Sequence, residues 1–219
     1  MPTATNTPTP TPNLTATARV ENAIATAENA AETWEIFLED TFDSNDNNWL
    51  EETSDDDYAL TFYEVVDGKY RWESTAHQGY IGWVRAGRDT FTDFYLSVDI
   101  QLIEAPDTAD YGIVFREDED SNFYYFAVSE SGQYALYLFF EEWSTLIDWT
   151  ETDLINAGKA NRITVIGEGS QFIFFINEQY LTEITNDQIP EGLTGFAVEM
   201  GNENDQGIFE FDNFELRAP

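Results

Sequence analysis

The stretch that decides the fold reads DFYLSVDIQLI, from Asp93 to Ile103. Apolar side chains occupy every second position in it, and most positions between them are polar. Successive side chains of a β-strand point to opposite faces, so this alternation predicts a strand with one buried and one solvated face.

The same alternation recurs on both sides of this stretch, in YGIVFRE, NFYYFAVSE, QYALYLFF, NRITVIGEG and QFIFFINEQ, with turn sequences such as ESGQ and VDGK between strands. About thirteen short strands with close turns predict an all-β fold, a two-sheet antiparallel jelly-roll sandwich, over residues 36–219. We also expect the last strand, Ile208–Leu216, to pair near the first, Leu38–Phe42.

Two segments of different composition precede the sandwich. Residues 1–13 read MPTATNTPTPTPN, and alternating Thr-Pro predicts an extended, disordered Thr/Pro-rich linker. Residues 14–35 are rich in Ala and Glu and predict a short helical stalk that docks Trp34 onto the sandwich. Its apolar stripe comprises Val20, Ile24, Ala27, Ala31, Trp34 and Leu38. A tether of this kind predicts an extracellular or cell-surface domain within a longer exported protein.

The charge balance limits the classes of partner. The chain has 43 acidic and 9 basic residues, a formal net charge of −34. Such a surface repels phosphate backbones, so no nucleic-acid partner is expected, whereas calcium is a possible cofactor. No apolar run approaches the ~18 residues of a membrane helix, so no direct membrane insertion is expected. The absence of cysteine excludes disulfides and thiolate sites.

The order of these signals resembles a known superfamily. DTFD (Asp40–Asp43) and DGKYRW (Asp67–Trp72) are followed by FTDFYLSVDIQL (Phe91–Leu102) and finally by FDNFEL (Phe211–Leu216). This succession resembles the concanavalin A-like lectin/glucanase jelly rolls, in particular bacterial surface modules similar to laminin-G-like domains and to the 3-keto-disaccharide hydrolase family. The resemblance covers about residues 38–217 and implies the fold; lectins, glycosidases and adhesion modules all share that architecture.

Catalysis has weaker support than binding. Glucanases of the resembled superfamily carry an E-x-D-x-(x)-E strand, and neither Glu151–Asp153 nor Glu203–Asp205 continues into that triplet. The single histidine, His77, has no serine-elbow motif or cysteine near it. We therefore assign no catalytic residues.

Two groups of oxygen donors are candidate calcium ligands. Asp118, Asp120 and Asn122 follow one another at every second position of an acidic turn. Carboxylate and amide oxygens are ligands that calcium prefers, although the full EF-hand spacing is absent. Asp40 and Asp212, on the two terminal strands that we expect to be neighbours, form a second candidate pair.

A candidate glycan-binding face follows from the alternation. If Phe94, Tyr111, Tyr124 and Tyr134 begin the inward-facing sets of their strands, one outer face carries the intervening aromatic and polar side chains. These are Tyr95, Asp99, Gln101, Arg116, Tyr125 and Tyr137. Aromatic rings stack on sugars while Arg, Asp and Gln bind hydroxyl groups. The alternative is a set of scattered surface aromatics on an ordinary solvated sheet face.

The tryptophans divide by position. Trp49 and Trp72 stand where core anchors are expected, whereas Trp83, Trp143 and Trp149 lie near turns and could line the rim of a cleft. The sequence therefore favours an extracellular, non-catalytic carbohydrate-binding or adhesive surface module with a glycan or cell-surface partner. The alternatives are a calcium-stiffened structural or self-assembling surface domain and a sugar-acting hydrolase.

Overall fold

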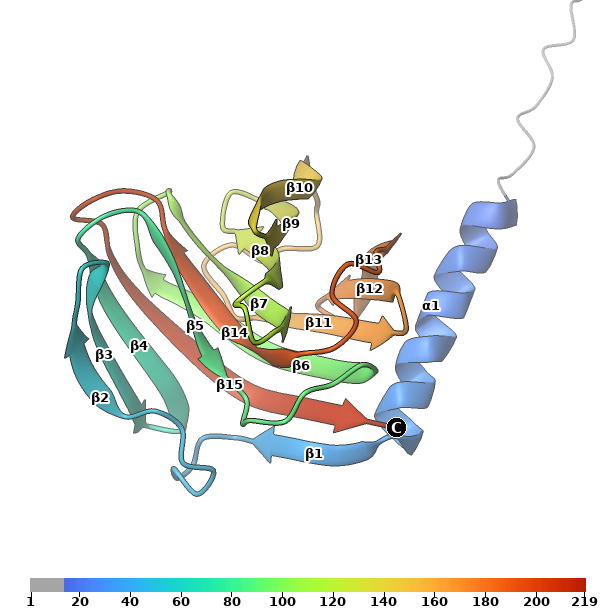
Figure 1. Cartoon of the computed structure of the whole chain (residues 1–219), viewed down its shortest axis with the longest axis horizontal. Coiled ribbons are helices and arrows are strands. Elements are labelled where there is room, and N and C mark those ends of the chain that lie inside the picture. Colours follow the sequence, from blue (N-terminus) through green and yellow to red (C-terminus); the bar gives the residue numbers. More distant parts are fainter. Residues whose placement is uncertain (1–13) are drawn as a thin grey trace, which may run out of the picture.

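The computed structural model describes residues 14–219 as two antiparallel β-sheets packed face to face and preceded by one helix (Figure 1). The predicted Thr/Pro-rich linker, residues 1–13, lies outside the described residues. The all-β sandwich is confirmed, and the terminal strands pair as expected, with Leu38 opposite Leu216.

The larger sheet has nine strands. In spatial order they are β13 (Gln179–Thr185), β12 (Gln171–Ile176), β11 (Asn161–Glu168), β6 (Phe94–Glu104), β15 (Gln206–Ala218), β4 (Lys69–Ala76), β3 (Ala59–Val66) and β2 (Glu52–Asp55), while β1 (Glu35–Asp40) pairs with β15. Figure 1 shows β2 and β3 at the end of the sandwich opposite the helix.

The smaller sheet has six strands. In spatial order they are β10 (Glu142–Glu151), β9 (Gln133–Phe140), β8 (Phe123–Ser129), β7 (Ala109–Glu117), β14 (Leu193–Met200) and β5 (Tyr80–Arg85). The chain passes from the larger to the smaller sheet between β6 and β7, so these consecutive strands belong to different layers.

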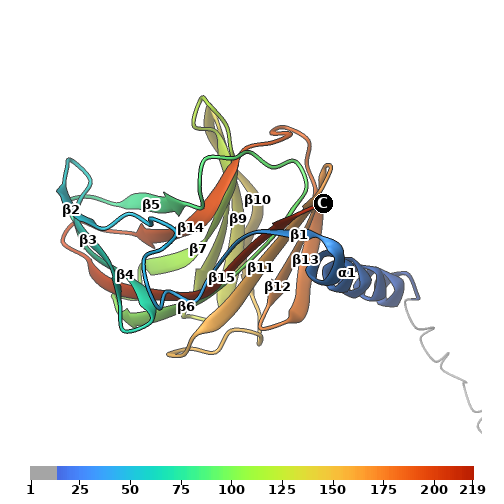
Figure 2. The same cartoon turned by 90° about the horizontal axis from the view of Figure 1, so that it is seen from below.

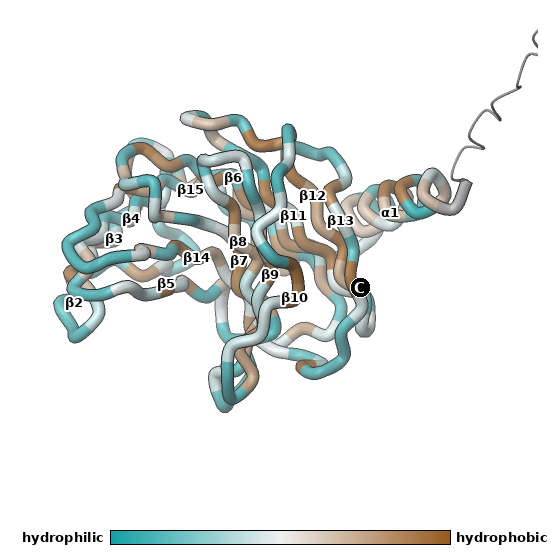
Figure 3. Tube along the Cα trace, turned by 90° about the horizontal axis from the view of Figure 1, so that it is seen from above, coloured by the Kyte–Doolittle hydropathy of each residue, from teal (hydrophilic) through white to brown (hydrophobic). Residues whose placement is uncertain are grey.

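The core lies between the inner faces of the sheets, as the alternation predicts. Phe94, Leu96 and Val98 of β6 are fully buried, and so are Tyr111 and Ile113 of β7. Trp49 and Trp72 are buried in the same cluster, which confirms them as core anchors. Figure 3 shows hydrophobic segments in strands such as β11 and β12. Burial of this many aromatic and aliphatic side chains is the main favourable term in folding.

The helix α1 (Leu14–Thr33) lies against the outer face of the larger sheet, beside β13 and close to the C-terminal end (Figures 1 and 2). Ala23 and Ala30 face the sheet and are buried, whereas Val20 and Ile24 are exposed. The predicted stripe was therefore wrong at its start, where Ala23 faces the sheet in place of Val20 and Ile24, and at its end, because the helix stops at Thr33 and Leu38 lies on β1. Trp34 is half-buried as expected, and its carbonyl oxygen accepts a 3.1 Å hydrogen bond from Arg217. No helix within residues 14–219 has both the length and the apolar character needed to cross a membrane.

Candidate functional site: an aromatic and acidic cleft around strand β5

The six residues predicted to share one binding face lie on two different sheets. Tyr95, Asp99 and Gln101 belong to β6 of the larger sheet, whereas Arg116, Tyr125 and Tyr137 belong to strands of the smaller sheet. The prediction of a single binding face was wrong. Alternation distinguishes inward from outward side chains along one strand, but it does not say which sheet the strand joins.

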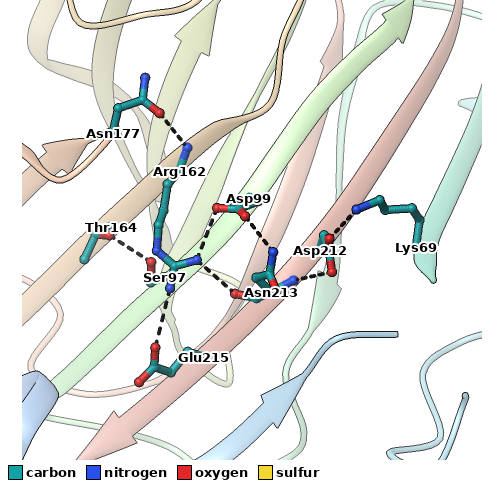
Figure 4. A network of polar contacts seen from close by, with 9 residues as sticks. All are labelled: Lys69, Ser97, Asp99, Arg162, Thr164, Asn177, Asp212, Asn213 and Glu215. Atoms are coloured by element: carbon teal, nitrogen blue, oxygen red, sulfur yellow. Dashed lines mark hydrogen bonds and ion pairs between the residues drawn. The ribbon is translucent and has the colours of Figure 1, made fainter. Parts of the chain in front are cut away.

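Asp99 is held in a polar network on the outer face of the larger sheet (Figure 4). Its carboxylate accepts a 3.1 Å hydrogen bond from Nη1 of Arg162 and a 2.8 Å bond from the side-chain amide of Asn213. Arg162 also pairs with Glu215, at 3.4 Å. These contacts join β6, β11 and β15, so the oxygens of Asp99 already stabilise the sheet.

The other two predicted residues of β6 also have structural neighbours. Tyr95 packs in the cluster beneath α1 that includes Ala23 and Trp34. Gln101 is half-buried and lies opposite Glu210 of β15.

Arg116 points into the protein rather than outward. Its backbone is in the left-handed region, with φ of 53°, beside an irregularity in the pairing of β7 with β14, so the regular alternation ends there. The guanidinium donates hydrogen bonds to the carbonyl oxygens of Ile189 at 3.0 Å, of Thr92 at 2.6 Å and of Gly169, and it lies over the ring of Phe172. Burial lowers the pKa of Arg116.

Several of the predicted calcium ligands already have hydrogen-bond partners within the protein. Asp118 accepts bonds of 2.9 Å from the backbone N–H groups of Asp120 and Asn122 and from the side-chain amide of Asn122. Asp40 accepts a 2.7 Å bond from the indole of Trp49, whereas Asp212 pairs with Lys69. Within residues 14–219 no three or more acidic, histidine or cysteine side chains are grouped to hold a metal. Calcium binding stays a prediction.

A cleft of about 700 Å³ wraps around β5, the edge strand of the smaller sheet. We call it the β5 cleft. One wall comes from β2 and β3 of the larger sheet and includes Glu52 and Tyr63, and the other comes from the smaller sheet. On that second wall lie Trp83, Phe123, Phe139, Trp143 and Glu199. The two sheet edges therefore frame a depression large enough for a small ligand.

Aromatic rings cover the outer face of the smaller sheet next to the cleft. Trp83 lies 4.8 Å from Phe123, centroid to centroid, and Trp143 contacts both Phe123 at 5.6 Å and Phe139 at 5.2 Å. Trp143 remains 51% exposed despite these contacts. A third ring, that of Tyr137, lies 6.3 Å away, so the half-exposed indole is held by three rings and offers a fixed, apolar stacking surface.

A buried carboxylate orients this aromatic wall. Glu117 of β7 accepts a 3.0 Å hydrogen bond from Nε1 of Trp83 and a 2.6 Å bond from Nε of Arg85, both on β5. The Glu117 side chain is buried, and its hydrogen bond to Arg85 raises the pKa of that arginine. Trp83 is thus fixed by a charge-assisted contact as well as by packing.

Two further carboxylates lie opposite each other beside the cleft. Asp110 of β7 and Glu199 of β14 are direct cross-strand partners. Burial raises the pKa of Asp110 to about 6, and burial together with the charge of Asp110 raises the pKa of Glu199 to about 7. Among residues 14–219 neither of them has a cationic partner. Nearby Tyr125 is fully buried, and its hydroxyl has no hydrogen-bond partner in this part of the chain.

Sequence reasoning found part of this site. Trp83 and Trp143 line the cleft, as the sequence suggested for them, whereas Trp149 does not line it and packs against Tyr137. Asp110, Glu117 and Glu199 were missed. The only sequence signal for each of these carboxylates was an acidic residue at an outward position of an otherwise apolar strand. An ordinary solvated sheet face shows the same pattern, so this signal does not identify a site. Only the pairing of β7 with β14 and β5 with β14 reveals that they converge.

Comparison with known proteins supports the architecture. No protein-family model matches the chain, and no curated protein matches its sequence. A carbohydrate-binding module, CBM66 from Bacillus subtilis, matches with a TM-score of 0.56 and 15% identity over 84% of this chain and 95% of that one. The catalytic domain of an endo-1,3-β-glucanase from Thermotoga petrophila matches with a TM-score of 0.59 and 7% identity, over 85% and 98% of the two chains. The fold is the concanavalin A-like jelly roll.

A third matching structure is longer than this chain. A GlcNAcα1-4Gal-releasing endo-β-galactosidase from Clostridium perfringens matches with a TM-score of 0.61 and 11% identity, over 86% of this chain and 64% of that one. These similarities show a common concanavalin A-like architecture, and at such low identity they establish no more than the fold.

Proposed function

We propose that this chain is an extracellular carbohydrate-binding module whose ligand lies in the β5 cleft. The observation that carries the proposal is the half-exposed indole of Trp143, fixed next to Trp83 at a cleft that also contains the carboxylate of Glu199. Aromatic faces stack on the C–H faces of sugar rings, and carboxylates accept hydrogen bonds from sugar hydroxyl groups.

The comparisons support the same class of ligand. The matching structures include a carbohydrate-binding module and a glucanase domain. The strongly acidic composition and the tether-like sequence of residues 1–13 support an extracellular setting. A glycan of a cell surface or of the surrounding medium is the proposed partner.

The test is binding to a glycan array, followed by calorimetry on the saccharides that bind. We expect Trp143→Ala and Trp83→Ala each to weaken binding at least about tenfold, as loss of a stacking contact does. Phe62→Ala is the matched control, because Phe62 is an exposed aromatic residue on β3 that does not line the β5 cleft. An equal loss in the control would place the ligand elsewhere, and the absence of binding to any saccharide by the folded protein would contradict the proposal.

Glycoside hydrolysis is a second candidate function, favoured by the Asp110–Glu199 pair. Retaining glycosidases hold two carboxyl groups about 5 Å apart, and directly opposite acidic residues on neighbouring strands can reach such a separation. Binding ranks first because Glu199 lines the cleft and Asp110 does not. Release of new reducing ends from a bound oligosaccharide, abolished by Glu199→Gln, would establish hydrolysis.

A further inference from the structure

The β5 cleft is lined by acidic and not by basic side chains, and we call the part of it around Glu199 its acidic end. Glu52, Asp56 and Glu199 line the cleft, and none of its lining residues is Lys, Arg or His. By contrast, Glu117, one strand away, is paired with Arg85. An anionic saccharide would meet repulsion at this end, whereas a neutral or cationic one would not.

The Asp110–Glu199 pair places two carboxyl groups side by side at this end. These two carboxylates are adjacent across β7 and β14, and burial disfavours the ionised form of both. Asp110 has a hydrogen bond from Ser129, whereas no protein donor to Glu199 is found in residues 14–219. Two neighbouring carboxylates in a poorly solvated place are stabilised either by a shared proton or by a cation.

Small side chains separate this pair of carboxylates from the hydroxyl group of Tyr125. Ala197, Gly112 and Ala127 form a cross-strand row over β14, β7 and β8, next to the row that contains Glu199 and Asp110. Tyr125 lies on the other side of this row of small residues, and the charges of Glu199 and Asp110 act on its phenol. The hydroxyl of Tyr125 has no partner within residues 14–219, although a buried hydroxyl normally has one.

We infer that the acidic end of the β5 cleft binds the primary ammonium group of an amino sugar, with Glu199 as its direct partner and Asp110 behind it. An ammonium group carries a full positive charge and N–H donors for the carboxylate of Glu199, which lines the cleft, and its charge also favours the ionised form of Asp110 beside it. The unpartnered hydroxyl oxygen of Tyr125 adds negative potential from behind the row of small residues. The indoles of Trp83 and Trp143, which both contact Phe123 and line the same cleft, then receive the sugar ring. This inference rests on the proposed function and specifies its ligand class.

The experiment compares a β-1,4-linked disaccharide of glucosamine with its N-acetylated counterpart, by calorimetry on the full chain at pH 7 in 0.3 M NaCl. Salt at this concentration screens the long-range attraction of a strongly acidic protein for any cation. We expect the amine form to bind at least about tenfold more tightly, a preference worth about 1.4 kcal/mol. In Glu199→Gln the preference should fall below about twofold, because affinity for the amine form falls more than affinity for the N-acetylated form, and Asp110→Asn should reduce the preference in the same direction.

Glu210→Gln is the matched control, because Glu210 lies on β15 of the larger sheet and outside the cleft. If Glu199→Gln and Glu210→Gln lost the preference for the amine form equally, the preference would reflect unspecific charge attraction, and the inference would be overturned. Equal binding of the two disaccharides would overturn it while leaving the proposed function intact, whereas no binding of either these or any other saccharide would overturn both. Binding of lysine amide as tightly as the glucosamine disaccharide would reject the saccharide as the source of the ammonium group.

Discussion

The indole Nε1 of Trp83 donates a 3.0 Å hydrogen bond to the buried carboxylate of Glu117. Trp83 lies on the edge strand β5 and Glu117 at the end of β7, and β14 separates the two strands. The hydrogen bond therefore reaches across a strand and fixes the ring that forms part of the cleft wall.

Removing Glu117 should disturb both stability and binding. Glu117→Ala leaves Arg85 and the indole of Trp83 without their acceptor, so we expect the free energy of unfolding to fall by about 2–4 kcal/mol. Saccharide affinity should fall with it, because Trp83 loses its fixed orientation. Chemical denaturation and calorimetry measure the two effects. Glu119→Ala, at an exposed neighbouring position, should change neither, and a comparable loss there would refute a specific role for Glu117.

Stability should depend on pH through the Asp110–Glu199 pair. Both folded-state pKa values are raised, to about 6 and about 7, from ordinary values of 3.8 and 4.5. The folded protein thus binds more protons than the unfolded chain between about pH 4 and pH 7, and the free energy of unfolding falls as pH rises through this window. A shift of two pKa units corresponds to about 3 kcal/mol.

Substitutions of Asp110 and Glu199 distinguish this pH dependence from the general charge repulsion within a strongly acidic protein. We expect Asp110→Asn and Glu199→Gln to reduce the fall of the free energy of unfolding with rising pH. Each variant should therefore gain more stability over the wild type at pH 7 than at pH 4. The groups facing the pair are Ser129 and Tyr125 on β8 and Tyr137 on β9. Tyrosine does not titrate in this range, so it should not contribute. Identical pH profiles for the variants and the wild type would contradict the prediction.

Arg116→Met should destabilise the protein by about 2–4 kcal/mol. The substitution keeps an apolar side chain but leaves the carbonyl groups of Ile189 and Thr92 without their donor. Arg88→Met, which alters an exposed arginine, should change the free energy of unfolding by less than about 0.5 kcal/mol. Urea titrations of both variants give the comparison; equal, small effects would mean that Arg116 does not hold these carbonyl groups.

Gly112→Ala should destabilise the smaller sheet by more than about 3 kcal/mol. An ideal Cβ at this position would lie 1.8 Å from the carbonyl oxygen of Phe126, so the backbones of β7 and β8 would have to separate. Gly158→Asn is a suitable control, because a Cβ there meets no atom within 4 Å and asparagine tolerates its φ of 72°. Thermal melting should show a large loss only for the first variant.

The alternation from Phe94 to Leu138 predicted the inward side chains correctly. Phe94, Tyr111, Tyr124 and Tyr134 all lie in the main core cluster. The prediction failed at Arg116, where a left-handed backbone conformation inverts the side chain. That conformation depends on the pairing of β7 with β14, which no local pattern around Arg116 reports.

The candidate site was predictable only in its aromatic part. Trp83 and Trp143 stand near turns, and large aromatic residues at such positions are reasonable candidates for a cleft rim. Glu199 and Asp110 are far apart in the chain and become partners only through strand pairing. Tyr95 and Asp99 had suitable chemistry for binding, but α1 and Arg162 contact them instead.

By itself, the sequence determined the fold class and the division of each strand into inner and outer side chains, because a β-strand repeats every two residues and this repeat is a local property. The tertiary structure alone decided which strands share a sheet, and therefore that Asp110, Glu117 and Glu199 gather beside Trp83 while Tyr95 and Asp99 lie on the opposite layer. Sheet membership depends on contacts between residues distant in the chain, and the same alternating segment fits either layer equally well.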